Sequence, residues 1–285
     1  MAFKGSLVAE GSEIVIRFWG VRGSIACPGP DTVRYGGNTS CVEVRAGKRV
    51  LIFDAGTGLR LLGEALLANN GAVDADLFFS HTHVDHVCGL PFFRPAFLPA
   101  SRLRFWAGHL LPHNTLKGVL SEMMQAPLFP VPLDILQARI EYTDFPCGDT
   151  LTPGNGFQLK TAPLNHPNGA TGYRFEGDGK VIAYITDTEH RPGELDRNIL
   201  ALCDRADVMI YDSTYTDAEY PSHVNWGHST WQEGVKLAKA AGVKTLAIFH
   251  HDPGHDDDTM DAIAAEAKKA FPGSVVAREG MVLRP

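Results

Sequence analysis

Short apolar runs separated by turn residues dominate both halves of the chain. Runs rich in Val, Ile, Phe and Tyr and bounded by Gly, Asn or Asp are typical of strands. The first half carries them at 13–20, 39–47, 49–56, the run ending at Ser80, and 102–108; the second half carries them at 157–164, 171–187, 206–212, 244–250 and near the end. Turn residues at 47–48 and 177–179 predict two hairpins.

Apolar residues at helical spacing occupy several of the intervening segments. In 57–70 the leucines at 59, 62, 66 and 67 share one face, which predicts a helix. In 229–242, Ser229 or Thr230 can cap a helix, with Gln232 or Glu233 as capping-box partner and Gly242 as the stop. We expect further helices from about His86, across 109–135 and over 256–270. The prolines at 126–133 indicate a surface excursion or lid within the second of these.

Two strand-rich halves interleaved with helices predict an α/β fold. The arrangement that buries such elements is an αββα sandwich, in which two mixed β-sheets pack face to face and helices cover the outer faces. The chain contains no linker, repeat or low-complexity tract, so we expect one domain over residues 1–285.

The composition is that of an ordinary globular protein, with 44% apolar and 21% charged residues in 285. A net charge of −7 without a basic block argues against a large nucleic-acid footprint but leaves nucleic acid and small anionic substrates open. Five scattered cysteines predict free thiols rather than a disulfide framework. Neither a signal peptide nor a membrane span is recognisable, so we expect a cytoplasmic protein; a homodimer stays open.

The densest chemical signal is ADLFFSHTHVDHVCGL at 75–90, where three histidines and an aspartate follow a buried strand. Residues i and i+2 of an extended segment point the same way, so His81 and His83 can bind one metal ion together. Asp85 and His86 lie where the chain turns into a helix and can face a neighbouring position. Imidazole with carboxylate suits zinc, iron, manganese or cobalt.

Single ligand-type residues follow three other strands. His166 comes after 157–164, Asp187 closes the hairpin at 171–187, and His250 closes 244–250. Open sheets gather their sites at the carboxyl ends of strands. We therefore expect these side chains to meet the cluster at 81–86.

HTHVDH with the later His, Asp and His resembles the metallo-β-lactamase superfamily, from DAGTG at 54–58 to FHHDP at 249–253. The resemblance implies that His81, His83 and His166 hold one metal ion. Asp85, His86 and His250 would hold a second ion, and Asp187 would bridge both. Asp54 would orient the ligands rather than bind metal. Two divalent ions are implied, zinc first, with manganese or iron as alternatives.

Three stretches resemble the phosphodiesterase branch of that superfamily, which includes ribonuclease Z and bacterial hydrolases similar to class II cyclic-nucleotide phosphodiesterases. They are YITDT, with aspartate where common secreted lactamases have cysteine, APLNHPNGATGYRFE and NWGHSTWQEGVKLAKAAGVKTLAIFH. In that branch a histidine before a capped helix assists phosphodiester cleavage, which implies this role for His228. The chain lacks the long glycine-rich arm of ribonuclease Z, and its loop at 250–258 is acidic.

The position of His228 also favours phosphate binding independently of the resemblance. His228 precedes the free N–H groups at a helix start, where a phosphate oxygen is stabilised. The positive helix end also favours a neutral imidazole. We expect a metal-bridging hydroxide to attack a small cyclic or nucleotide phosphodiester, with Asp85 as proton acceptor and His228 assisting the leaving oxygen. The alternatives are a thioester or lactone hydrolase, ribonuclease Z-like RNA processing, and a non-catalytic metal-binding regulatory domain.

Overall fold

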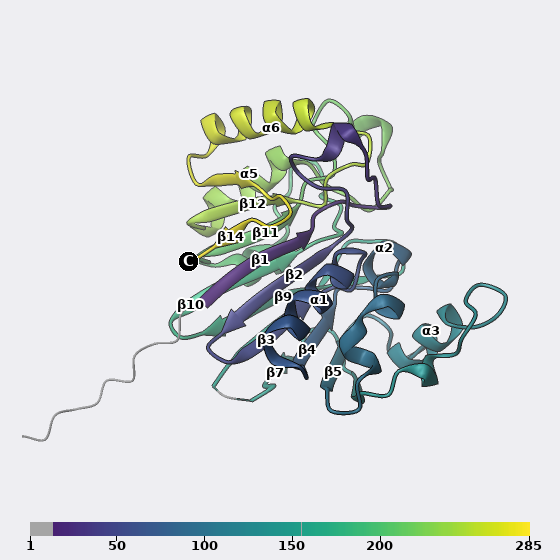
Figure 1. The fold of residues 1–285 in the computed structure, drawn as a ribbon. Coiled ribbons are helices and arrows are strands. Elements are labelled where there is room, and N and C mark those ends of the chain that lie inside the picture. Colours follow the sequence, from purple (N-terminus) through teal and green to yellow (C-terminus); the bar gives the residue numbers. More distant parts are fainter. Residues whose placement is uncertain (1–13, 155) are drawn as a thin grey trace, which may run out of the picture.

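A computed structural model describes residues 14–154 and 156–285, and within them the strands form two seven-stranded sheets (Figure 1). The N-terminal residues that were expected to contain no signal peptide, with the first residue of the strand expected at 13–20, lie outside these ranges. The first sheet runs, in spatial order, β14 (Val282–Leu283), β1 (Ile14–Gly20), β2 (Cys41–Ala46), β3 (Arg49–Phe53), β4 (Asp74–Phe79), β5 (Arg102–Ala107) and β6 (Arg139–Asp144). The second runs β13 (Ser274–Val276), β12 (Thr245–Phe249), β11 (Val208–Asp212), β10 (Lys180–Ile185), β9 (Ala170–Gly177), β8 (Gln158–Leu164) and β7 (Thr150–Leu151).

Both sheets are mixed, because each joins antiparallel hairpins to parallel strands. β2 and β3 pair antiparallel around the expected turn at 47–48, and β9 and β10 pair antiparallel around 178–179. β3 to β6 are parallel, as are β10 to β13. Parallel neighbours bring their carboxyl ends to the same edge of a sheet.

Helices cover the outer faces of the two sheets. They are α1 (Gly58–Asn70), α2 (Val84–Val87), α3 (Leu116–Met123), α4 (Arg197–Cys203), α5 (Trp231–Ala241) and α6 (Asp257–Ala270), with 3-10 turns η1 (Pro30–Thr32), η2 (Leu90–Phe92), η3 (Arg94–Phe97), η4 (Leu133–Ile135) and η5 (Tyr220–Ser222). α1 and α3 pack on the first sheet, and α4, α5 and α6 pack on the second.

Apolar side chains on both faces of the two sheets form three buried layers. In β4, Phe78 enters the layer between the sheets, whereas Leu77 and Phe79 enter the layer under α1. A third layer lies under α4, α5 and α6. Side chains of a strand point alternately to opposite faces, so an uninterrupted apolar run such as Leu77–Phe79 is what a strand buried on both faces requires. The expected αββα sandwich is confirmed.

Several expected elements differ in extent. The helix expected from His86 begins at Val84 and lasts one turn, because Gly89, Pro91 and Pro95 prevent its continuation. Of 109–135, only α3 and the turn η4 are helical. The segment stands away from the rest of the ribbon, and Leu128 in it is 82% exposed, which agrees with the predicted surface excursion (Figure 1). The strands β6 and β7 and the short helix α4 were not predicted.

The helix expected over 229–242 is confirmed as α5. Thr230 caps it by accepting the Glu233 N–H at 3.1 Å, and Gly242 ends it at a φ of 65°. All five cysteines are free thiols, as expected. Within the described ranges, no helix has the length and apolarity needed to cross a membrane.

Candidate metal centre

The ligand-type residues singled out in the sequence gather at the carboxyl ends of strands from both sheets. The segment 81–86 follows β4 of the first sheet. His166 follows β8, Asp187 follows β10 and His250 follows β12, all in the second sheet. The side chains that the sequence places at four separate points therefore share one region.

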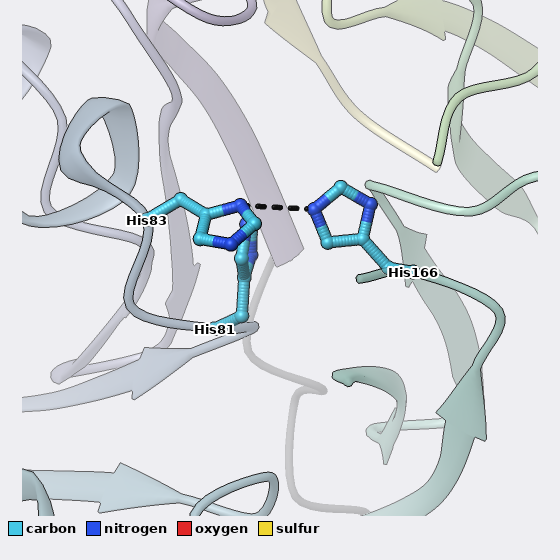
Figure 2. A group of neighbouring side chains, drawn as sticks. All are labelled: His81, His83 and His166. Carbon is cyan, nitrogen blue, oxygen red and sulfur yellow. Dashed lines mark hydrogen bonds between the residues drawn. The ribbon is translucent and has the colours of Figure 1, made fainter. Parts of the chain in front are cut away.

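His81, His83 and His166 form a first group, each offering a nitrogen within 4.8 Å of the others. Figure 2 shows their imidazole rings turned toward one another, with His83 Nδ1 lying 3.0 Å from His166 Nε2. All three nitrogens thus face a common point, which is the arrangement a single metal ion requires.

Asp85, His86, Asp187 and His250 form a second group, again with ligand atoms within 4.8 Å of one another. His86 Nε2 lies 3.1 Å from Asp85 Oδ2 and 3.3 Å from His250 Nε2. All four residues are buried. The group contains two carboxylates and two imidazoles, a donor set suited to divalent transition metals.

Asp187 belongs to the second group and also lies next to the first. Its Oδ1 is 3.7 Å from His81 Nε2 and 3.8 Å from His166 Nε2, while its Oδ2 is 3.2 Å from His86 Nε2. Burial raises the pKa of this carboxyl, but the imidazoles around it, His250 first, hold it well below its usual range. Asp187 can therefore contribute one oxygen to each group as an anion.

Each of the five imidazoles has its other nitrogen held by a protein atom. The contacts are His81 Nδ1 to Ser80 Oγ (3.1 Å), His83 Nε2 to Asn168 Oδ1 (3.3 Å), His86 Nδ1 to Asp54 Oδ2 (2.8 Å), His166 Nδ1 to the Gly227 carbonyl (2.8 Å) and His250 Nδ1 to Thr214 Oγ1 (3.0 Å). Such partners fix the ring orientation and the tautomer of metal-binding histidines.

His81 gives the clearest sign that these residues fit a metal ion. Its Nε2 is buried and has no hydrogen-bond partner among the residues that the structure describes. Burial, followed by the neighbouring His86, lowers its pKa well below the usual value, so the ring is neutral. A neutral imidazole whose nitrogen has no hydrogen-bond partner is the form that binds a cation. A buried nitrogen left without any partner would lower the stability of the folded protein.

Asp54 lies next to the two groups without belonging to either of them. Its carboxylate accepts the Ser80 N–H at 2.7 Å, the Ser80 hydroxyl at 2.7 Å and the Tyr184 hydroxyl at 2.8 Å, besides contacting His86. Through these contacts Asp54 can orient Ser80 and His86, and its role as an orienting residue stays a prediction.

His228 lies beside both groups, and its partner was not anticipated. His228 Nδ1 is 3.0 Å from Asp212 Oδ2. Burial alone would lower the pKa of His228, but the Asp212 carboxylate raises it to about 9. The Asp212 carboxylate thus favours the protonated ring, whereas the helix end alone was expected to favour the neutral one. Asp212 is the last residue of β11, so like Asp187 it lies at the carboxyl end of a strand of the second sheet.

Five of the other histidines contact residues outside the two groups. His109 contacts Thr82, His190 contacts Ser229, His223 stacks on Tyr215, His251 donates to the Ala277 carbonyl, and His255 contacts Glu219. The cavity of about 700 Å³ next to α4 is lined by none of the ligand-type residues of the two groups.

Comparison with known proteins shows to which class of proteins this chain is similar. The family model described as "Beta-lactamase superfamily domain" matches residues 48–251. Ribonuclease Z of Gemmatimonas aurantiaca is 26% identical over 94% of each chain. Among solved structures, the metallo-β-lactamase fold protein YhfI of Bacillus subtilis has a TM-score of 0.70 at 18% identity and covers 96% of this chain and 100% of its own. A diphosphatase of the PhnP family has a TM-score of 0.69 at 17% identity, covering 95% and 98%.

The chain belongs to the metallo-β-lactamase superfamily. The predicted superfamily and the prediction of a hydrolase of that fold are confirmed, and the ribonuclease Z relatives support the phosphodiesterase branch. The clusters of histidine and aspartate can bind divalent metal.

Proposed function

We propose that this chain is a dinuclear metal-dependent phosphodiesterase that hydrolyses a small phosphodiester. The observation that carries the proposal is the position of Asp187 in one group of ligand atoms and next to the other, with the His228–Asp212 pair at their side. A site of this kind can hold two ions and also supply a proton to a leaving group.

The first ion is assigned to His81, His83 and His166, the second to Asp85, His86 and His250, and Asp187 serves both. When bound, two divalent cations supply an activated water and neutralise charge on the phosphoryl oxygens. Zinc is our first choice because imidazole nitrogens outnumber carboxylates in the two groups, with manganese or iron as alternatives.

His228 acts on the leaving oxygen in this proposal. Asp212 fixes one nitrogen of the ring and stabilises the imidazolium, so the other nitrogen can donate a proton. Asp85 is assigned as acceptor of a proton from the attacking water. The Ser24 N–H donates to Asp85 Oδ2 at 2.9 Å, which holds that carboxylate at the edge of the second group.

The negative charge of the protein supports the proposal of a small substrate. The net charge is −7, and the segment that follows His250 contains Asp252, Asp256 and, in the first turn of α6, Asp257 and Asp258. Such an acidic segment repels a long polyanion more than a compact diester. Processing of RNA is the second candidate, because the curated relatives are named ribonuclease Z. The free thiols support a reducing compartment, and we propose the cytoplasm.

The test is a parallel assay on zinc-loaded protein with bis(p-nitrophenyl) phosphate, a cyclic nucleotide, a transfer RNA precursor, a thioester and a lactone. We expect turnover of the first two above all others. Cleavage of the precursor alone would favour the RNA candidate. Hydrolysis of the thioester or the lactone alone would replace the phosphodiesterase assignment, and a protein that binds metal but cleaves nothing would favour a regulatory role.

A further inference from the structure

Trp226 is a large apolar side chain left in solvent beside the metal centre. It is 62% exposed, and only Gly227 separates it from His228. The Gly227 carbonyl accepts from His166, and a Cβ on Gly227 would lie 2.4 Å from His166 Nδ1. The backbone that carries the tryptophan is therefore in contact with the first group of ligands.

The turn around Trp226 is held by one carboxylate. Glu189 accepts the Asn225 N–H at 2.7 Å and the Gly227 N–H at 2.9 Å, which are the N–H groups on either side of the tryptophan. It also accepts the Tyr220 hydroxyl at 2.9 Å. Asn225 has a φ of 71°, which a residue with a Cβ keeps only where its surroundings impose it, and Gly227 has a φ of 87°, which glycine adopts without strain.

Aromatic rings connect the tryptophan to the interior of the site. The Trp226 and His223 rings lie 5.0 Å apart and nearly perpendicular. His223 stacks on Tyr215 at 4.2 Å, and Tyr215 meets His228 edge-on at 6.1 Å. Trp226 is thus the outer member of a row of rings that begins at His228.

We propose that Trp226 is a stacking platform for a nucleobase carried by one ester oxygen of the substrate. The inference rests on the proposed phosphodiesterase function and specifies its substrate as a nucleotide diester. A rigidly presented, solvent-exposed indole offers a flat π-face, and stacking is the interaction by which proteins hold bases without reading their sequence. An aliphatic ester group has no π-face, so it would gain little binding energy from contact with Trp226.

The kinetic test compares two esters with the same leaving group, thymidine 5′-(p-nitrophenyl phosphate) and methyl p-nitrophenyl phosphate. Trp226→Ala should raise KM for the thymidine ester roughly tenfold or more, with kcat and the methyl ester little changed. Trp226→Phe should retain most of the preference. Val33→Ala, at a residue 75% exposed, controls for loss of surface apolar area. Equal losses of both esters in Trp226→Ala would overturn the inference.

A binding test does not depend on turnover. Calorimetry with thymidine 5′-phosphate and ribose 5-phosphate should show that the wild-type protein binds the base-bearing ligand about tenfold more tightly. Trp226→Ala should lose that difference and Trp226→Phe should keep most of it. No preference in the wild type, or an unchanged preference in Trp226→Ala, would overturn the platform. If neither ester is hydrolysed while the binding difference appears, the proposed reaction fails and the platform stands.

Discussion

Three residues of the candidate site adopt left-handed backbone conformations although none is glycine. Asp54, Asp187 and His250 have φ of 61°, 57° and 61°, and each lies just after a strand. This conformation costs roughly 1–2 kcal/mol for a residue with a Cβ. It turns the chain sharply at the strand end, so that the side chain enters the site rather than continuing the alternation of the strand.

Asp187 and Asp54 should differ in what their loss does. Asp187→Ala removes the carboxylate that belongs to the second group and lies next to the first, so it should lower bound metal and abolish turnover of bis(p-nitrophenyl) phosphate. Asp54→Ala leaves all proposed ligands in place and should cost about 10–100-fold, as loss of an orienting partner does. Elemental analysis and steady-state rates measure both. Full activity of Asp187→Ala in metal-replete buffer would exclude the two-ion arrangement.

His228→Ala should affect substrates according to their leaving group. A ribose alkoxide needs a proton far more than p-nitrophenolate does, so a cyclic nucleotide should lose at least about tenfold more rate than bis(p-nitrophenyl) phosphate. Asp212→Asn should show the same selectivity, because the ring then loses the charge that stabilises its protonated form. Metal content should stay constant in both variants. Equal losses on the two substrates would assign His228 to packing or binding instead.

At the scale of elements, the positions of the proposed ligands were predictable because they follow strands with clear apolar patterns. The residue types at 81–86, 166, 187 and 250 are chemically distinctive. Asp212 was missed because an aspartate ending a strand is common, and its meaning depends on His228 lying opposite it. The strand β6 alternates only weakly, and α4 has seven residues, so neither carries a sufficient periodic signal.

The turn before α5 should be sensitive to a single methyl group. Gly227→Ala strains a φ of 87° and forces a Cβ against His166, so metal content and turnover should fall. Gly193 is the matched control, with a φ of 82° and no atom within 4 Å of an added Cβ. Both variants should lose roughly 1–2 kcal/mol of stability from the backbone strain. Denaturant unfolding measures the loss of stability, and elemental analysis measures the loss of metal. Equal metal contents in Gly227→Ala and Gly193→Ala would show that His166 tolerates a Cβ at position 227.

At the scale of the molecule, the proposed ligands come from both sheets. His81, His83 and His86 follow the first sheet, whereas His166, Asp187 and His250 follow the second. A bound ion would therefore connect the two layers at one end of the sandwich, in addition to the apolar layer between them. The site and the packing of the sheets should be thermodynamically linked.

Removal of metal should consequently lower the melting temperature. An ion present at about 100 times its Kd adds about 2.7 kcal/mol of stability, and for a chain of this size that corresponds to a shift of roughly 5–10 °C. Scanning calorimetry with zinc and after chelation measures the change. Asp187→Ala should melt at nearly the same temperature in both conditions. A wild-type protein whose melting temperature does not respond to chelation would show that metal does not connect the sheets.

The pairing of β14 with β1 has a consequence for association between copies of the chain. β14 contributes only the pairs Ile16 with Leu283 and Arg17 with Val282, yet these cover the open side of β1. An uncovered strand offers a row of free N–H and C=O groups to any other strand. Fraying of two residues near the end of the chain would therefore turn β1 into a template for edge-to-edge aggregation. On this side of the first sheet, whose opposite edge is β6, the short β14 is the strand that keeps β1 from pairing with a second molecule.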